Sequence, residues 1–212
     1  MTTQTLPLLR DHIPSLYAKA IALLRQKAAA GDPGAKAALA DIEAVDGSAR
    51  VRLTGEGELY VSARRGAVTV ADTAGEIPVK VALEVPPQAV GLVLGEALKD
   101  GALDEAAAAQ SVPPIASKRF EDALAGRPLT CHIKVRGVPE LGDVPVKLGF
   151  NVTEPPETPG FTCEIAYADL EAARDGKTTP QELFLGGKLK MGGDYSLALQ
   201  LAMQLMQPPA QA

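Results

Sequence analysis

The chain has 212 residues, with 21 Lys and Arg against 26 Asp and Glu, which gives a formal net charge of -5. A surface that binds nucleic acid needs an excess of basic residues, so this charge argues against nucleic acid as a partner. Two cysteines and two histidines are too few for a disulfide framework or a four-ligand zinc site. We therefore expect a globular protein without a metal or other cofactor.

The sequence has no pattern typical of a membrane span or of a secretory signal. The longest apolar run, residues 89–98, is broken by Gly91, Gly95 and Glu96, and a span needs roughly 18 apolar residues. The first residues lack the charged start and apolar block of a signal peptide. We expect a cytoplasmic protein.

Residues 1–46 predict two helices. Apolar residues recur at helical spacing up to Ala30, and Pro14 fits the first turn of this helix. Residues 31–34 have the sequence Gly-Asp-Pro-Gly, which favours a turn. A second helix is expected over residues 36–45.

Residues 47–112 predict a strand-rich unit, because the period of the apolar residues changes to two. Alternation is clear over residues 51–53, 59–63, 67–71 and 79–85, with glycine-containing turns between them. Pro86 and Pro87 end the last of these strands and open a helix that extends to Leu98.

Residues 113–212 repeat this order. A short helix over residues 117–125 precedes alternating strands at residues 129–135, 144–152 and 161–167. Residues 77–100 and 161–175 share one succession: an alternating strand, then a short helix, then glycine. This likeness predicts a diverged internal duplication.

The last helix, expected over residues 197–206, is apolar almost all round. Only Gln200 and Gln204 are polar, and they lie on one narrow stripe. A surface helix normally has a polar face opposite its apolar stripe. This helix is therefore either buried on several sides or in contact with an apolar molecule that is not protein. The helix follows a strand expected at residues 188–191, and Asp194 is the residue expected to cap its start.

The order of short motifs in this C-terminal part resembles that of a known family. The motifs are Tyr-Ala-Asp-Leu at residues 167–170, Gly-Lys at 176–177, Pro-Gln at 180–181, Phe184, Gly-Lys-Leu-Lys at 187–190, Gly193, and Leu-Ala-Leu at 197–199. This string is similar to the C-terminal half of sterol carrier protein-2, or nonspecific lipid-transfer, domains. The match is good over residues 161–206 and extends by pattern alone over residues 116–152.

The resemblance implies an α+β fold, in which helices cover a mixed or antiparallel five-stranded sheet, with an apolar tunnel between them. It implies that the chain binds and carries a sterol, fatty acid, acyl-CoA or phospholipid, and that it is not an enzyme. The residues expected to border the tunnel are Phe161, Leu170, Phe184, Leu189, Met191, Leu197, Leu201 and Leu205. The family domain is about half as long as this chain, so the N-terminal half is additional and resembles a diverged second copy.

Two other functions stay open at this stage. An enzyme could use the same apolar cavity on a sterol-like or polyketide-like substrate, and its candidate polar groups are Tyr167, Asp169, Asp194 and Tyr195. A structural module without ligand, acting in dimerisation, is the second alternative.

Two further features bear on partners and redox state. Arg50, Arg52 and the Arg64-Arg65 pair are candidates for transient contact with an anionic membrane surface. Cys131 and Cys163 lie on the apolar side of their strands, so we expect buried, reduced thiols.

Overall fold

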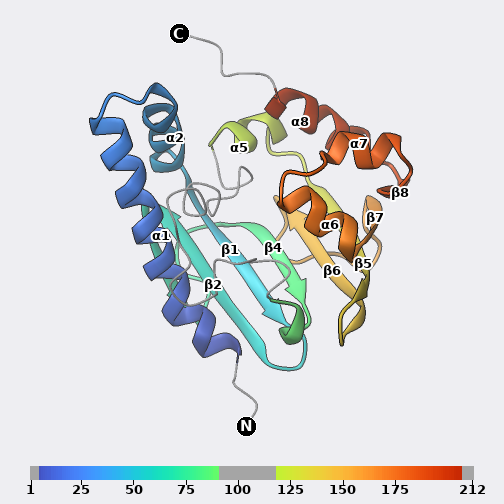
Figure 1. The fold of residues 1–212 in the computed structure, drawn as a ribbon. Helices are drawn as coiled ribbons and strands as arrows, with labels where there is room; N and C mark the ends of the chain where they lie inside the picture. Colours follow the sequence, from blue (N-terminus) through green and yellow to red (C-terminus); the bar gives the residue numbers. More distant parts are fainter. Residues whose placement is uncertain (1–4, 91–117, 207–212) are drawn as a thin grey trace.

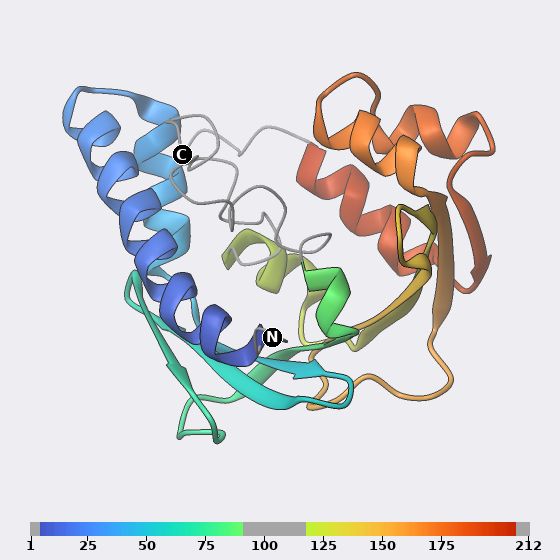
Figure 2. The ribbon, with the colours of Figure 1, turned by 60° about the horizontal axis from the view of Figure 1, so that its bottom comes forward.

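The computed structural model describes residues 5–90 and 118–206. Its described strands form one sheet, and Figure 2 shows the helices gathered on one face of that sheet. In chain order (Figure 1) the elements are α1 (Thr5–Ala29), α2 (Pro33–Glu43), β1 (Asp46–Leu53), β2 (Gly57–Arg64), β3 (Ala67–Ala71), β4 (Val79–Val85), η1 (Pro87–Ala89), α5 (Lys118–Leu124), β5 (Leu129–Val138), β6 (Gly142–Phe150), β7 (Phe161–Ala166), α6 (Tyr167–Arg174), α7 (Pro180–Leu185), β8 (Lys190–Gly193) and α8 (Ser196–Met206).

The sheet has eight strands in the order β3-β2-β1-β4-β6-β5-β7-β8, so the expected five-stranded sheet is wrong in strand number. The first four strands come from the N-terminal half of the chain and the last four from the C-terminal half. The halves join where β4 pairs antiparallel with β6, with Leu83 opposite Leu148. An unpaired sheet edge exposes a row of backbone donors and acceptors, and this pairing covers one such edge in each half.

The two halves share a pattern of strand connections. β1 and β2 form an antiparallel hairpin, and β4 then lies parallel to β1 on its other side. In the same way β5 and β6 form a hairpin, and β7 lies parallel to β5. The expected boundary at residues 112–113, and most of the helix expected to end at Leu98, lie outside the described residues.

The N-terminal helices follow the predicted pattern with one correction. Helix α1 begins at Thr5, so Pro14 lies inside the helix and not in its first turn. Proline inside a helix removes a hydrogen bond, but packing of an apolar face supplies most helix stability in proteins. Leu9 and Ile21 of α1 are buried with exposed fractions of 1% and 2%. Helix α2 is capped by Asp32, whose Oδ1 accepts a hydrogen bond from the backbone N–H of Ala35 at 3.1 Å.

The C-terminal elements are set by local capping and by one glycine. Thr179 and Glu182 form a capping box at the start of α7, as the Thr-Pro sequence favours. Strand β8 begins at Lys190, two residues later than expected. It ends at Gly193, whose φ is +81° and whose added Cβ would lie 2.7 Å from the Gly160 carbonyl oxygen. Only glycine permits this close approach of the end of β8 to the backbone at the start of its partner strand β7.

Strand residues alternate between two faces, which we call the inner face, toward the helices, and the outer face. The main core lies on the inner face and draws buried residues from both halves, among them Leu53 and Leu59 from the N-terminal half and Val135 and Ile165 from the C-terminal half. A second cluster contains Leu201 of α8 with three residues of α5 and β6. One apolar layer therefore extends across the join between β4 and β6.

We predict that Leu59→Ala lowers the free energy of unfolding by about 2–5 kcal/mol, because Leu59 is fully buried and its truncation leaves a cavity. Leu141→Ala is the matched control. Leu141 is 40% exposed, so its truncation is expected to change stability by less than about 0.5 kcal/mol. Urea unfolding followed by circular dichroism measures both. Equal losses in the two variants would contradict the assignment of the core.

Candidate functional site

The inner face carries a row of apolar residues that the rest of the structure covers only in part. Six consecutive strands, β1-β4-β6-β5-β7-β8, each contribute at least one such side chain, and we take from each strand one that is not fully buried. We call this set the apolar strip: Val51, Leu83, Leu148, Ile133, Cys163 and Met191.

Strand pairing places the members of the strip side by side. Val51 lies opposite Leu83, and Leu83 opposite Leu148. One pair further along the strands, Ile133 lies opposite Cys163, and Cys163 opposite Met191. The strip is therefore continuous from strand to strand. Between β6 and β5 it shifts along the strand direction by two residues, which is one inward-facing position.

The structure brings some of the eight predicted ligand-binding residues together near this strip. Met191 belongs to the strip. Leu170 and Leu189 are partly buried against the main core, and Leu197 packs against the cluster that contains Leu201. Phe161 begins β7 and is buried, with 7% of its surface exposed.

Of the other two predicted residues, Phe184 is partly buried and the side chain of Leu205 is not described. The ring of Phe184 meets the edge of Tyr195 at a centroid distance of 6.2 Å. The side chain of Leu205 lies outside the described part of the chain.

Leu201 has the surroundings of a core residue. It is 2% exposed and packs with Phe120, Leu124 and Phe150, so it holds α8 against α5 and β6. On the opposite side of α8, Leu199 and Met203 are 37% and 63% exposed. The apolar side chains of this helix are therefore divided between a packed face and a more exposed face.

Sequence reasoning missed the N-terminal members of the strip, Val51 and Leu83, because the resemblance covered only the C-terminal half. It also left out Ile133, Leu148 and Cys163. Alternation in the sequence had placed all five on the apolar sides of their strands. The missing information was the pairing of β4 with β6, which local periodicity does not encode.

The two cysteines lie on neighbouring strands of the inner face and are both free, as expected. Burial raises the pKa of Cys131 to about 12, and it also raises the pKa of Cys163. Cys131 is buried as expected, whereas Cys163 is partly exposed, so the expectation of burial is wrong for Cys163. Both thiols are therefore protonated at neutral pH and are poor nucleophiles.

The four polar groups considered for an enzyme have separate partners. The Tyr167 hydroxyl donates to Glu171 Oε1 at 2.8 Å, and Lys188 Nζ donates to Asp169 Oδ1 at 2.9 Å. Asp194 Oδ1 accepts from the backbone N–H of Ser196 at the start of α8, as its predicted capping role requires, and the Tyr195 ring contacts Phe184. These contacts orient the C-terminal helices and do not converge on one reacting position.

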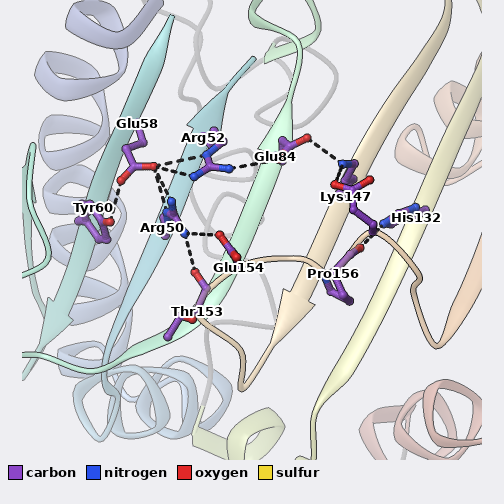
Figure 3. Close-up of polar contacts among 11 residues, drawn as sticks. Arg50, Arg52, Glu58, Tyr60, Glu84, His132, Lys147, Thr153, Glu154 and Pro156 are labelled. Atoms are coloured by element: carbon purple, nitrogen blue, oxygen red, sulfur yellow. Dashed lines mark hydrogen bonds and ion pairs between the residues drawn. The ribbon is translucent and has the colours of Figure 1, made fainter. Parts of the chain in front are cut away.

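The outer face is polar, and its charges are paired across the two halves (Figure 3). Glu58 Oε2 accepts from Arg50 Nη2 at 2.7 Å, and Arg50 Nη1 lies 3.2 Å from Glu154 Oε2 in the loop after β6. Glu84 of β4 pairs with Lys147 of β6 at 3.2 Å. Hydrogen bonds and ion pairs therefore connect the halves on this face, as apolar packing does on the other.

These pairings fix the protonation states of the groups involved. Hydrogen bonding from Arg50 lowers the pKa of Glu58, and hydrogen bonding to Glu58 raises the pKa of Arg50 and of Tyr60. A general acid or base works best with a pKa near the working pH, and these shifts move each group further from neutrality. The network is suited to holding strands together and unsuited to proton transfer.

The arginines named for membrane contact are largely engaged with carboxylates. Arg52 lies 3.4 Å from Glu58 and 3.9 Å from Glu84, and Arg64 lies 3.4 Å from Asp46. Arg50 is only 16% exposed. These contacts leave little unpaired positive charge at Arg50, Arg52 and Arg64 for an anionic headgroup.

A hollow of about 680 Å³ lies at the β1–β2 turn. Its lining residues are Arg52, Leu53, Thr54, Gly55, Glu56, Gly57, Glu58 and Glu84, and none of them is a predicted ligand-binding residue. Within residues 5–90 and 118–206, no three His, Cys, Asp or Glu side chains are placed to hold a metal ion. No helix in these residues is long and apolar enough to cross a bilayer.

We predict that Glu58→Gln reduces the dependence of stability on acid pH. Glu58 has a pKa below its ordinary value of 4.5, so its ion pair stabilises the fold above that value. This contribution is lost as the pH falls through the lowered pKa. Urea midpoints at pH 7 and at about pH 3 should therefore differ more for the natural chain than for Glu58→Gln. An equal difference in both would show that this network does not contribute.

Comparison with known proteins gives a family match and structural similarities. The model of the SCP-2 sterol transfer family matches residues 97–206, and a search of curated proteins found no match. The solved structures found include sterol carrier protein 2 from Yarrowia lipolytica in its apo form, with 17% identity over 41% of this chain and 73% of that chain, at a TM-score of 0.29.

Two insect proteins are also similar to this chain. For sterol carrier protein domain 2 of Helicoverpa armigera the identity is 20% over 57% of this chain and 90% of that one, with a TM-score of 0.31. For sterol carrier protein 2 like 2 from Aedes aegypti the identity is 19% over 40% and 91%, with a TM-score of 0.26. The family model alone spans just over half of the 212 residues, including all elements from α5 to α8. The chain belongs to the SCP-2 sterol transfer family.

Proposed function

We propose that this protein binds and carries an apolar lipid on the inner face of its sheet, beneath the C-terminal helices, and that it does so without chemistry. Membership of the family supports lipid binding or transfer in general. The observation that carries the proposal for this chain is the apolar strip, in which six neighbouring strands each present an incompletely buried apolar side chain.

The chemistry of the inner face favours an apolar ligand. The strip is flanked by buried apolar residues, Leu53 and Val85 on one side and Phe150 and Phe161 on the other. Burial of apolar surface stabilises a complex by about 25 cal/mol per Å², without any need for a polar anchor. The charged strand residues described above lie on the outer face, where they are paired with one another.

Among residues 5–90 and 118–206, the four polar groups considered for an enzyme do not converge, and this favours a carrier over an enzyme. The thiols of Cys131 and Cys163 have raised pKa values, and the tyrosines and aspartates near the C-terminal helices each have a separate partner. An enzyme would need at least one group whose pKa suits proton transfer or nucleophilic attack.

A diverged duplication is a second element of the proposal. The shared hairpin-and-parallel-strand connection of β1, β2, β4 and of β5, β6, β7 supports it. In this arrangement β4 of the N-terminal copy pairs with β6 of the C-terminal copy. It covers a sheet edge that would otherwise be free.

The first test is purification under native conditions followed by mass spectrometry of the bound lipids. We expect a lipid in stoichiometric amount, or displacement of cis-parinaric acid by long-chain fatty acids at micromolar concentration after lipid removal. Denatured protein serves as the control for nonspecific partition. A natural chain that neither carries a lipid nor binds the probe would contradict the carrier function.

A second test uses Cys163 as a reporter in the single-thiol variant Cys131→Ser. Because burial raises the pKa of Cys163, a thiol-directed maleimide should react slowly at neutral pH and faster as the pH rises above 9, the ordinary value. Saturating hexadecanoic acid should slow the reaction further, because the strip would then be covered. Labelling in urea gives the unprotected rate. Equal rates with and without the fatty acid would place the ligand away from Cys163.

A further inference from the structure

We infer that the apolar strip is one site shared by both halves of the chain, and that it takes a single elongated lipid with a long acyl chain, part of which lies on Val51 and Leu83. This inference rests on the proposed carrier function and extends it to the N-terminal half. That half lies almost wholly outside the residues that match the family model, which begins at residue 97.

The first step of the argument is continuity across the join. Leu83 of β4 and Leu148 of β6 are direct partners in an antiparallel pair, so their side chains lie next to each other on the inner face. Leu83 and Val51 pack against the main core, and so does Ile133 of the C-terminal half. No described residue separates the N-terminal part of the strip from the C-terminal part.

The second step concerns burial. Central strands of an eight-stranded sheet are normally its most buried part, yet β1, β4 and β6 each present a partly exposed apolar residue at the middle of this sheet. Some of the residues that flank them are packed: Leu53 and Val85 are 1% exposed, and Phe150 is 5% exposed. On the other side of Val51 and Leu83, Ala49 and Val81 are partly exposed, so the incompletely covered surface includes these two neighbours of the strip.

The third step concerns shape. Strands lie about 4.8 Å apart, so a row over six strands is roughly 24 Å long. Buried residues flank the strip on both sides along β6, β5 and β7, whereas Ala49 beside Val51 and Val81 beside Leu83 are partly exposed. A row of this length fits an extended, unbranched acyl chain better than a compact ring system. The N-terminal members Val51 and Leu83 add about two strand spacings to what the C-terminal half offers alone.

The test compares inward and outward substitutions on the same strands of the full chain. Leu83→Gln and Leu148→Gln place an amide on the strip, in the N-terminal and the C-terminal half respectively. Glu84→Gln and Lys147→Gln are the matched controls, since they create the same residue one position away on the outer face. The delipidated proteins are titrated with cis-parinaric acid, which is then displaced by octanoic, dodecanoic or hexadecanoic acid.

For the natural chain we expect one bound probe per chain and an affinity that rises about fourfold for each added methylene up to a long chain. Both Leu83→Gln and Leu148→Gln should weaken hexadecanoic acid binding by about tenfold or more. In the two outer-face controls the affinity for hexadecanoic acid should stay within about twofold of that of the natural chain. A polar change on the outer face does not alter the apolar area that the ligand buries. Thermal unfolding of each variant verifies that it is folded.

Val51→Thr is a second variant that keeps a β-branched side chain of nearly the same shape. The threonine places a hydroxyl on the strip and, being β-branched like valine, suits a strand. We expect the affinity for hexadecanoic acid to fall by about threefold or more. It therefore tests the N-terminal half even where Leu83→Gln is unstable.

Two results would overturn the inference while leaving the carrier function intact. In one, Leu148→Gln loses the probe while Leu83→Gln and Val51→Thr bind hexadecanoic acid as the natural chain does, which confines the site to the C-terminal half. In the other, two probes bind per chain, which gives each half its own site. Failure of the natural chain to bind any lipid would instead remove the proposed function itself.

Discussion

The antiparallel pairing of β4 with β6 is the constraint on which the rest of this structure depends. Each strand would otherwise leave an open sheet edge in its half of the chain. Pairing joins the two inner faces into one apolar layer and the two outer faces into one charged layer. The ion pair between Glu84 and Lys147 and the bridge from Arg50 to the loop at Glu154 cross the join on the outer face. A slip of one residue would turn these charges toward the helices, so both layers specify the same register.

The parts of the fold that depend on local chemistry could be predicted from the sequence. Alternation located the strands, the Gly-Asp-Pro-Gly turn and Asp32 located the start of α2, and the Thr-Pro sequence at residues 179–180 located α7. The strand number could not be predicted in this way, because Leu83 and Leu148 are far apart in the sequence and no local period relates them. Pro14 was misplaced for a related reason, since the packing of α1 on the sheet overrides its local preference.

The candidate site shows the same division. The chemical character of the C-terminal residues followed from the family resemblance, but their burial did not. Leu201 looked equivalent to Met191 in the sequence, yet Leu201 is sealed against Phe120 and Phe150 whereas Met191 is partly exposed beside Cys163. Contacts between α8 and α5 decide this difference, and such long-range contacts are not visible in the spacing of apolar residues.

An incompletely covered strip has an energetic consequence for the whole fold. Full burial of a leucine or isoleucine side chain contributes about 1.5–3 kcal/mol, so several partly exposed apolar residues at the centre of a sheet represent stability that the chain alone does not realise. A ligand that covers them supplies the missing contacts and stabilises the native state in proportion to the logarithm of its concentration above Kd. In the proposed complex the ligand would contact strands of both halves, so this stabilisation would act on both halves at once. Lipid binding and the union of the two halves would then be thermodynamically coupled.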